Sequence, residues 1–211
     1  MRAQIITMLE MQDRMNAVVH PQWVSQRYEW YRAVWIECAE LLDHYGYKWW
    51  KKQSPEVEQV RLEIIDIWHF GMSALFADER SIENIGDEIE AAINSHESAA
   101  DTVEFRSLVE ALAEDCLASK GFSVAIFWQL LDAADMSFDD LYTAYIGKNV
   151  LNFFRQDHGY KDGSYVKSWE GREDNEHLVE LLENLDSSRP DFRDALYDAL
   201  AERYQSIAVL A

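Results

Sequence analysis

The stretch RLEIIDIWHFGMS, residues 61–73, places two carboxylates on a helix that is otherwise apolar almost all the way round. Glu63 and Asp66 are three positions apart, so they point to the same side of a helix. A helix that is apolar on every side is buried, and a buried carboxylate loses several kcal/mol unless a cation or dense hydrogen bonding replaces water. The sequence therefore predicts a helical core in which this pair has a cationic partner.

A second pair of carboxylates lies upstream in WIECAELLDHYGYKWWK, residues 35–51. Glu37 and Glu40 are again three apart and share a helix face with His44, a pattern that by itself is typical of a solvated surface. If the two helices pack antiparallel through the short connection at 46–54, the four carboxylates converge on one point. Hard divalent cations such as Mg²⁺ prefer oxygen ligands of this kind. The two pairs together therefore predict a metal site.

A di-iron site is the alternative that this pattern leaves open. Such sites in helical bundles use Glu-x-x-His pairs, whereas the spacings here are Glu-x-x-Glu and Glu-x-x-Asp. His69 follows Asp66 by three positions, so this one pair leaves iron binding open as an alternative.

The composition favours helices throughout the 211 residues, because only 8 glycines and 3 prolines occur and β-branched runs are scarce. Helical periodicity predicts helices over 3–18, 22–45, 55–77, 81–94, 101–118, 121–133, 138–155, 173–185 and 190–207. We therefore expect an all-α fold.

The charge of the chain limits its partners. A formal net charge of -20 argues against non-specific binding to nucleic acid or to anionic membranes. No apolar run approaches the ~20 residues of a membrane span, and the N-terminus is too polar for a signal peptide. Cys38 and Cys116 lie in helix-like segments without metal-site spacing, so we interpret them as buried thiols in a reducing compartment. These features predict a cytoplasmic protein.

Positive charge gathers in one part of this acidic chain. Acidic residues dominate 78–140, but five cations and only three carboxylates fall within 148–172. The same region contains a long non-helical segment, 157–172, with four aromatic or histidine side chains that argue against disorder. We expect an ordered cationic loop, suited to an anion.

The two carboxylate motifs, ECAELLDHYGYKWWK (37–51) and EIIDIWHFGMS (63–73), occur together with MQDRMN (11–16) and KNVLNFFRQDHGYKDGSYVKSWEGREDN (148–175). In these motifs the chain closely resembles the dimeric all-α dUTP diphosphatases, which belong to the all-α nucleoside triphosphate pyrophosphatases. The resemblance implies a helical-bundle core with an acidic helical insertion, in a homodimer. Residues 1–77 and 138–211 would form the catalytic core, and 78–137 an acidic lid or subdomain within it.

The resemblance also implies roles for individual residues. The Mg²⁺ ligands would be Glu37, Glu40, Glu63 and Asp66. The catalytic residues would be Glu37, Glu40, Lys148 and Arg155. The substrate contacts would be Gln12, Asn16, Trp50, His69, Phe70, Lys148, Asn152, Arg155, Tyr160, Lys161 and Asn175.

The activity implied by the resemblance is hydrolysis of dUTP, and also of dUDP, to dUMP, which removes dUTP from the nucleotide pool and supplies dUMP. Two or more Mg²⁺ ions would assist, with Mn²⁺ as a substitute, and Glu37 would take a proton from the attacking water. Gln12 and Asn16 would read the uracil edge, since an amide offers both a donor and an acceptor. An amide can rotate, however, so this pair by itself leaves dCTP or another nucleotide as an alternative substrate.

Overall fold

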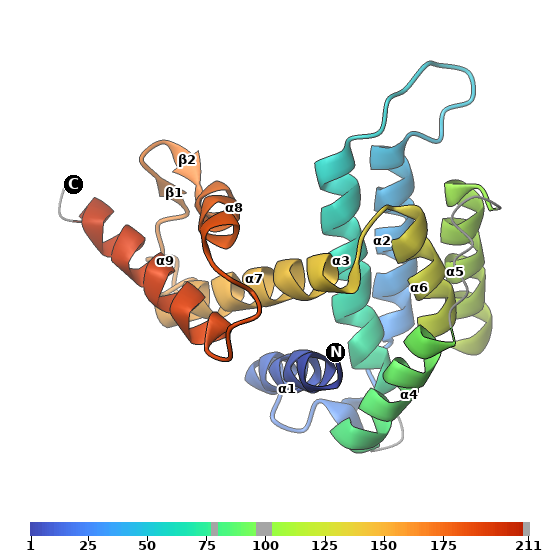
Figure 1. Cartoon of the computed structure of the whole chain (residues 1–211), viewed down its shortest axis with the longest axis horizontal. Helices are drawn as coiled ribbons and strands as arrows, with labels where there is room; N and C mark the ends of the chain where they lie inside the picture. The colour runs from blue at the N-terminus through green and yellow to red at the C-terminus, as the bar shows by residue number, and fades with distance from the viewer. Residues whose placement is uncertain (77–79, 96–102, 209–211) are drawn as a thin grey trace. The chain divides into compact units, whose positions relative to one another are not determined.

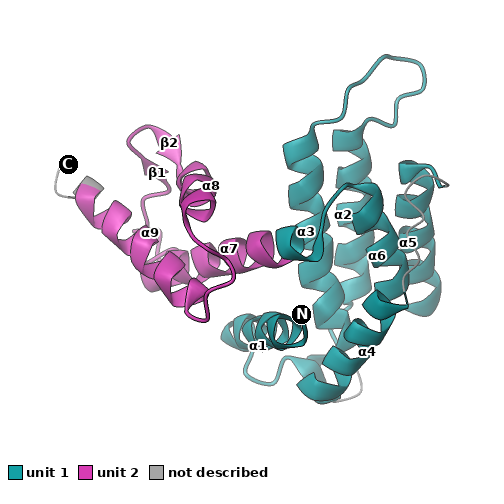
Figure 2. Ribbon diagram, viewed as in Figure 1, with its two compact units in different colours: residues 1–141 teal, residues 142–211 magenta. Residues whose placement is uncertain are grey.

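The computed structural model describes residues 1–76, 80–95 and 103–208. In these residues almost all regular structure is helical, so the predicted all-α class is confirmed (Figure 1). The chain divides into two compact units, Met1–Leu141 and Tyr142–Ala211 (Figure 2). Each unit is described by itself below.

The first unit is built around two long helices. Its elements are α1 (Arg2–Val19), a 3-10 turn (Val24–Gln26), α2 (Trp30–Tyr45), α3 (Val57–Leu75), α4 (Ile82–Asn94), α5 (Phe105–Ser119), α6 (Val124–Ala133) and the start of α7 (Phe138–Asp157). Helices α2 and α3 lie side by side, joined at one end by an extended loop (Figure 1), and they share the most extensive helix–helix contact. The antiparallel pairing predicted from the two carboxylate motifs is therefore present.

Helix α3 is buried on several sides, as its apolar sequence predicts. Ile64 and Ile67 are completely buried, and Trp68 stacks on Phe127 of α6 with ring centroids 4.9 Å apart. Gly71 allows another close approach, because a Cβ atom at this position would lie 2.5 Å from a neighbouring phenylalanine ring. The carboxylates of α3 therefore project from a helix that belongs to the core of the unit.

The helix expected over 22–45 was wrong over its first eight residues. Helix α2 begins only at Trp30, and Arg27 before it has a left-handed backbone with φ of 51°. Trp23 explains the interruption: its ring is 3% exposed, its Nε1 donates to Asp13 Oδ1 at 2.8 Å, and it packs edge-on against Phe76. The chain turns here because burial of a tryptophan outweighs the local helical periodicity.

The acidic middle of the chain belongs to the first unit. Helices α4, α5 and α6 pack on one another and on α1, α2 and α3, and the boundary between the units falls after Leu141. Residues 78–79 and 96–102 of this segment, including the start of the helix expected over 101–118, lie outside the described residues. The assignment of 78–137 as a lid or subdomain of the catalytic core stays a prediction.

The second unit contains the rest of α7, a two-stranded hairpin of β1 (Ser168–Trp169) and β2 (Arg172–Glu173), then α8 (Asp174–Asn184) and α9 (Phe192–Ala208). The segment expected to be non-helical over 157–172 is ordered, and its end forms the hairpin, with Ser168 opposite Glu173. Phe154 and Trp169 are completely buried in an aromatic core. Burial of these rings orders the segment, as its aromatic content predicts.

Two observations concern the chain as a whole. Cys38 and Cys116 are buried free thiols, as expected, and burial together with the nearby Asp115 carboxylate raises the pKa of Cys116 to about 12. Among the described helices, none combines the length and apolar character needed to cross a membrane.

Candidate functional site

The packing of α2 against α3 brings three carboxylates together. Oxygen atoms of Glu37, Glu63 and Asp66 lie within 4.8 Å of one another. Glu63 is buried at 8% exposure, and the other two are half-buried. Three carboxylates at this separation repel one another unless protons or a cation intervene. We call Glu37, Glu63 and Asp66 the acidic cluster.

The electrostatics of the acidic cluster show this repulsion. Burial, the charge of Asp66 and a hydrogen bond with Glu63 raise the pKa of Glu37 to about 8, and the charge of Glu40 adds to the effect. Burial also raises the pKa of Glu63, although the hydrogen bond with Glu37 opposes the shift. Without a cation the cluster therefore retains a proton at neutral pH, shared through the contact between Glu37 and Glu63.

Glu40 and His44 flank the acidic cluster. Glu40 is exposed and lies outside the three-residue group, but its charge raises the pKa of both Glu37 and Glu63. His44 Nε2 lies 3.7 Å from Glu63 Oε1, while its Nδ1 lies 2.8 Å from Glu56 Oε2. Glu40 is therefore near enough to influence the charge of the acidic cluster, but it is not one of the three grouped residues.

The donor set of the acidic cluster fits a hard cation. All three members offer carboxylate oxygens, the ligands that Mg²⁺ prefers. His69, whose spacing from Asp66 left an iron site open, instead places its Nδ1 2.9 Å from Gln12 Oε1. The grouped ligand atoms are carboxylate oxygens alone, and His69 is not one of the three residues of the cluster.

A second polar group lies further along α3, where its side chains meet α1. Gln12 and Asn16 are buried at 4% and 5% exposure, and each donates from its amide nitrogen to Ser73 Oγ, at 3.0 and 2.9 Å. Gln12 Nε2 also donates to Asn16 Oδ1 at 3.2 Å. We call Gln12, Asn16, His69 and Ser73 the amide network. The sequence identified all of these residues as candidates except Ser73.

Ser73 also lines a cavity of about 670 Å³, a size typical of small-molecule sites. The other lining residues are Trp23, Val24, Ser25, Arg27, Tyr28, Glu29, Trp30, Tyr31, Ala74, Phe76 and Lys120. Ser73 follows Asp66 by seven positions, two helical turns or ~10 Å. This spacing from Asp66 on one helix is the local feature that could have pointed to Ser73, whereas no sequence pattern pointed to the aromatic lining from 23–31.

The aromatic residues predicted to contact the base differ in their placement. Phe70 is half-buried and stacks on Trp30, a residue of the cavity wall, with ring centroids 6.3 Å apart. Trp50 is 60% exposed and lies beside Trp49 in the loop that joins α2 to α3. The cavity lies at the other end of this helix pair, where Trp30 begins α2 and Ser73 lies near the end of α3. Within one chain, Phe70 is therefore near the cavity and Trp50 is not.

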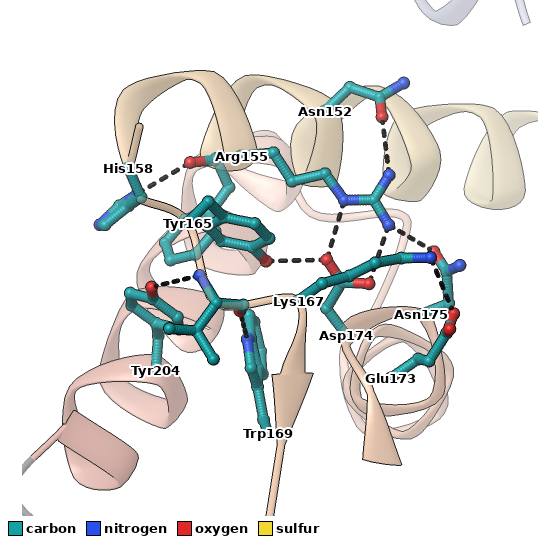
Figure 3. Close-up of polar contacts among 12 residues, drawn as sticks. Asn152, Arg155, His158, Tyr165, Lys167, Trp169, Glu173, Asp174, Asn175 and Tyr204 are labelled. Carbon is teal, nitrogen blue, oxygen red and sulfur yellow. Dashed lines mark hydrogen bonds and ion pairs between the residues drawn. The ribbon is translucent and has the colours of Figure 1, made fainter. Parts of the chain in front are cut away.

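The second unit carries the predicted cations. Arg155 of α7 donates from Nε and Nη2 to the two oxygens of Asp174, both at 2.8 Å (Figure 3). The same guanidinium reaches Asn152 Oδ1 at 3.4 Å and Asn175 Oδ1 at 3.2 Å. Tyr165 donates to Asp174 as well, at 2.8 Å. The Arg155 guanidinium thus brings together the predicted residues Asn152 and Asn175, and its own partner is Asp174, which the sequence did not single out.

Asp174 is completely buried and ionised. Burial raises its pKa, but hydrogen bonds from Arg155 and Tyr165 outweigh burial and hold the pKa below its usual range. Burial and the hydrogen bond to Asp174 raise the pKa of Tyr165, which stays a donor. The guanidinium is therefore held rigidly in one orientation by a charge-assisted, bidentate contact.

The remaining predicted cationic residues are more open to solvent. Lys148 is half-buried on the same face of α7 as Asn152 and Arg155, while Tyr160 and Lys161 are exposed just after the helix. Lys167 forms an exposed ion pair with Glu173 at 3.1 Å.

Comparison with known protein families identifies a match. A family model described as dUTPase matches residues 4–160 of the chain. The matched region contains the acidic cluster, the amide network and α7. No curated protein matches the chain.

Proposed function

The chain belongs to the dUTPase family and is a dUTP diphosphatase, and from this premise we propose that it hydrolyses dUTP, and also dUDP, to dUMP with Mg²⁺. The observation that carries the proposal is the acidic cluster on α2 and α3, two helical turns from the Ser73 wall of the aromatic cavity. A nucleoside triphosphate needs both features, a cation site for its phosphates and an aromatic, polar pocket for its base.

Glu37, Glu63 and Asp66, with Glu40 from the solvent side, are the proposed ligands for two or more Mg²⁺ ions. When bound, Mg²⁺ neutralises phosphate charge and lowers the pKa of water. Glu37 is the proposed proton acceptor for the attacking water. It is half-buried, whereas Glu63 is buried, so the Glu37 carboxylate has more access to water than that of Glu63.

The proposed phosphate contacts are Lys148, Asn152, Arg155, Tyr160, Lys161 and Asn175. The buried Asp174 carboxylate supports this assignment for Arg155, because it orients the guanidinium without requiring rearrangement. Lys148 and Lys161 supply further positive charge in an otherwise acidic chain.

The proposed base contacts are Gln12 and Asn16, with His69 holding Gln12 and Phe70 continuing the aromatic surface beside Trp30. Burial of both amides supports the assignment, because a buried polar pair discriminates strongly between ligands that satisfy it and ligands that do not.

A pyrophosphate-release panel over dUTP, dCTP, dTTP and UTP tests the proposed function. We expect dUTP to have the highest kcat/KM, by ~100-fold or more over dCTP, and the activity to disappear when Mg²⁺ is chelated. Equal rates on dUTP and dCTP, or full activity without a divalent cation, would contradict the proposal. Visible absorbance of the purified protein would instead support iron.

Mg²⁺ is expected to stabilise the protein more at about pH 8 than at about pH 6, because bound protons must leave the acidic cluster before metal enters. Glu37 has a folded pKa of about 8, above its ordinary value of 4.5. The metal-free protein therefore binds extra protons between these values, and its stability falls as the pH rises through about 8. Thermal melts with and without Mg²⁺ at both pH values measure the difference.

Glu37→Gln serves as the control for this pH effect. Without the titrating carboxylate, the metal-free variant should show a smaller loss of stability over the same pH interval. A parent-like pH dependence in this variant would show that Glu37 is not the responsible group.

We also propose a cytoplasmic homodimer. The buried thiols of Cys38 and Cys116 suit a reducing compartment, and Tyr47, Trp49 and Trp50 form an exposed aromatic surface at 46%, 90% and 60% exposure. Exposed aromatic clusters are typical of protein interfaces, and a homodimer would give Trp50 a partner chain to contact. Sedimentation at micromolar concentration distinguishes dimer from monomer.

A further inference from the structure

Ser73 is the centre of the amide network. It is 1% exposed, and its Oγ accepts from Gln12 Nε2 at 3.0 Å and from Asn16 Nδ2 at 2.9 Å. The same oxygen donates its own proton to the backbone carbonyl of His69 at 3.0 Å. A serine hydroxyl has one proton and two lone pairs, so these three contacts use its full hydrogen-bonding capacity.

These contacts decide which way both amides face. Each amide nitrogen points toward Ser73, and each carbonyl oxygen has a different partner: Gln12 Oε1 faces His69 Nδ1 at 2.9 Å, and Asn16 Oδ1 accepts from Gln12 at 3.2 Å. If either amide rotated by half a turn, a carbonyl oxygen would meet the Ser73 oxygen, whose proton is committed to His69. The amide carbonyl oxygen and Ser73 Oγ would then be two buried acceptors in contact with no proton between them. Such an unsatisfied pair costs folding free energy.

The orientation of an amide matters for the choice between two pyrimidines. Uracil presents an N3–H donor beside the O4 acceptor, whereas cytosine presents an N3 acceptor beside the N4 amino donor. Among the contacts of the described residues, Asn16 uses one of its two N–H groups and one of its two oxygen lone pairs. What it offers a base is therefore a donor beside an acceptor, and rotation of the amide reverses their order.

We propose that Ser73 determines the selection of uracil over cytosine by locking the orientation of Gln12 and Asn16. This inference rests on the proposed function, in which the two amides read the base. Ser73 acts through the amides and is a positioning residue. Its place in the cavity wall and in the amide network connects the two features.

The test compares Ser73→Ala with Ser73→Thr. Alanine removes the acceptor that holds both amides, and we expect the ratio of kcat/KM for dUTP to that for dCTP to fall by ~10-fold or more, since the discrimination depends on a buried polar contact. Threonine keeps a hydroxyl that can bond the carbonyl four residues earlier, so it should restore most of the ratio. Thermal melts of each variant separate specificity from folding.

Two further variants separate this inference from the proposed function. Asn16→Ala should lower kcat/KM for dUTP. If kcat/KM stays at the parent value, Asn16 does not contact the base, and the base-binding part of the proposed function is wrong. If Asn16→Ala lowers it but Ser73→Ala keeps the parent nucleotide ratio, only the role of Ser73 is overturned. Ser73→Cys, which nearly keeps the volume but accepts weakly, should shift the ratio in the same direction as alanine. A parent ratio in the cysteine variant would also overturn the inference.

Discussion

Replacing Glu63 with glutamine is expected to lower kcat/KM for dUTP by ~100-fold or more, because metal-ion stabilisation of a transition state is worth several kcal/mol. Glu63 is the most buried member of the acidic cluster, with Glu37 and Asp66 within 4.8 Å. The same substitution should raise the melting temperature of the metal-free protein at about pH 8, because one of three repelling carboxylates is removed. Opposite changes in activity and stability are expected when repelling carboxylates are kept together for function.

Glu58→Gln is the matched control for this experiment. Glu58 is an exposed carboxylate on the same helix, α3, so its replacement changes the net charge equally without touching the cluster. We expect parent-like kcat/KM and an unchanged response to Mg²⁺. If Glu63→Gln turned over dUTP at the parent rate, the acidic cluster would not be the metal site.

The second large effect is expected at Asp174. Asp174→Asn should destabilise the second unit by about 3 kcal/mol, because it leaves the largely buried guanidinium of Arg155 without its charged partner. Asp174 is completely buried and accepts from Arg155 and Tyr165. Urea unfolding followed by circular dichroism measures the loss. The kcat/KM for dUTP should fall as well, since Arg155 loses its fixed orientation.

The pH dependence of the same variant gives an independent readout. The folded pKa of Asp174 lies below its ordinary value of 3.8. Its contribution to stability is therefore fully present above that value and is lost as the pH falls through the lower folded pKa. In Asp174→Asn this loss on the acid side should be absent.

Asp191→Asn is the control in the same unit. Asp191 pairs with Arg189 on the surface, where both side chains are exposed, and such pairs contribute little because solvent screens them. Its replacement should leave the urea midpoint close to that of the parent. An equal loss of stability in both variants would show that the buried pair of Arg155 and Asp174 has no special role.

The sequence predicted the candidate residues better than their partners. The pairs Glu37/Glu40 and Glu63/Asp66 were visible because a spacing of three residues is a local property of a helix. Ser73 was not identified, since its contacts join residues 57 and 61 positions apart in the chain. Asp174 was not identified for the same reason, because its role is to bind the guanidinium of Arg155, 19 positions earlier in the chain.

Local periodicity was also insufficient where a single side chain changed the path of the backbone. The helix expected from residue 22 begins only at Trp30, since Trp23 is buried against Asp13 and Phe76. This turn and the first residues of α2 together supply most of the aromatic wall of the cavity. Because this region was predicted to be a continuous helix, the cavity that it lines was not predicted either.

The sequence by itself determined the all-α class, the helical order and the residue types suited to magnesium and phosphate, because helical periodicity and ligand chemistry are local properties. The tertiary structure decided which of these residues meet. It placed Glu37, Glu63 and Asp66 within one cluster, left Glu40 toward solvent, and gave the two amides a common partner in Ser73. The physical reason is burial: charges and amides withdrawn from water must find partners, and only packing brings those partners within reach.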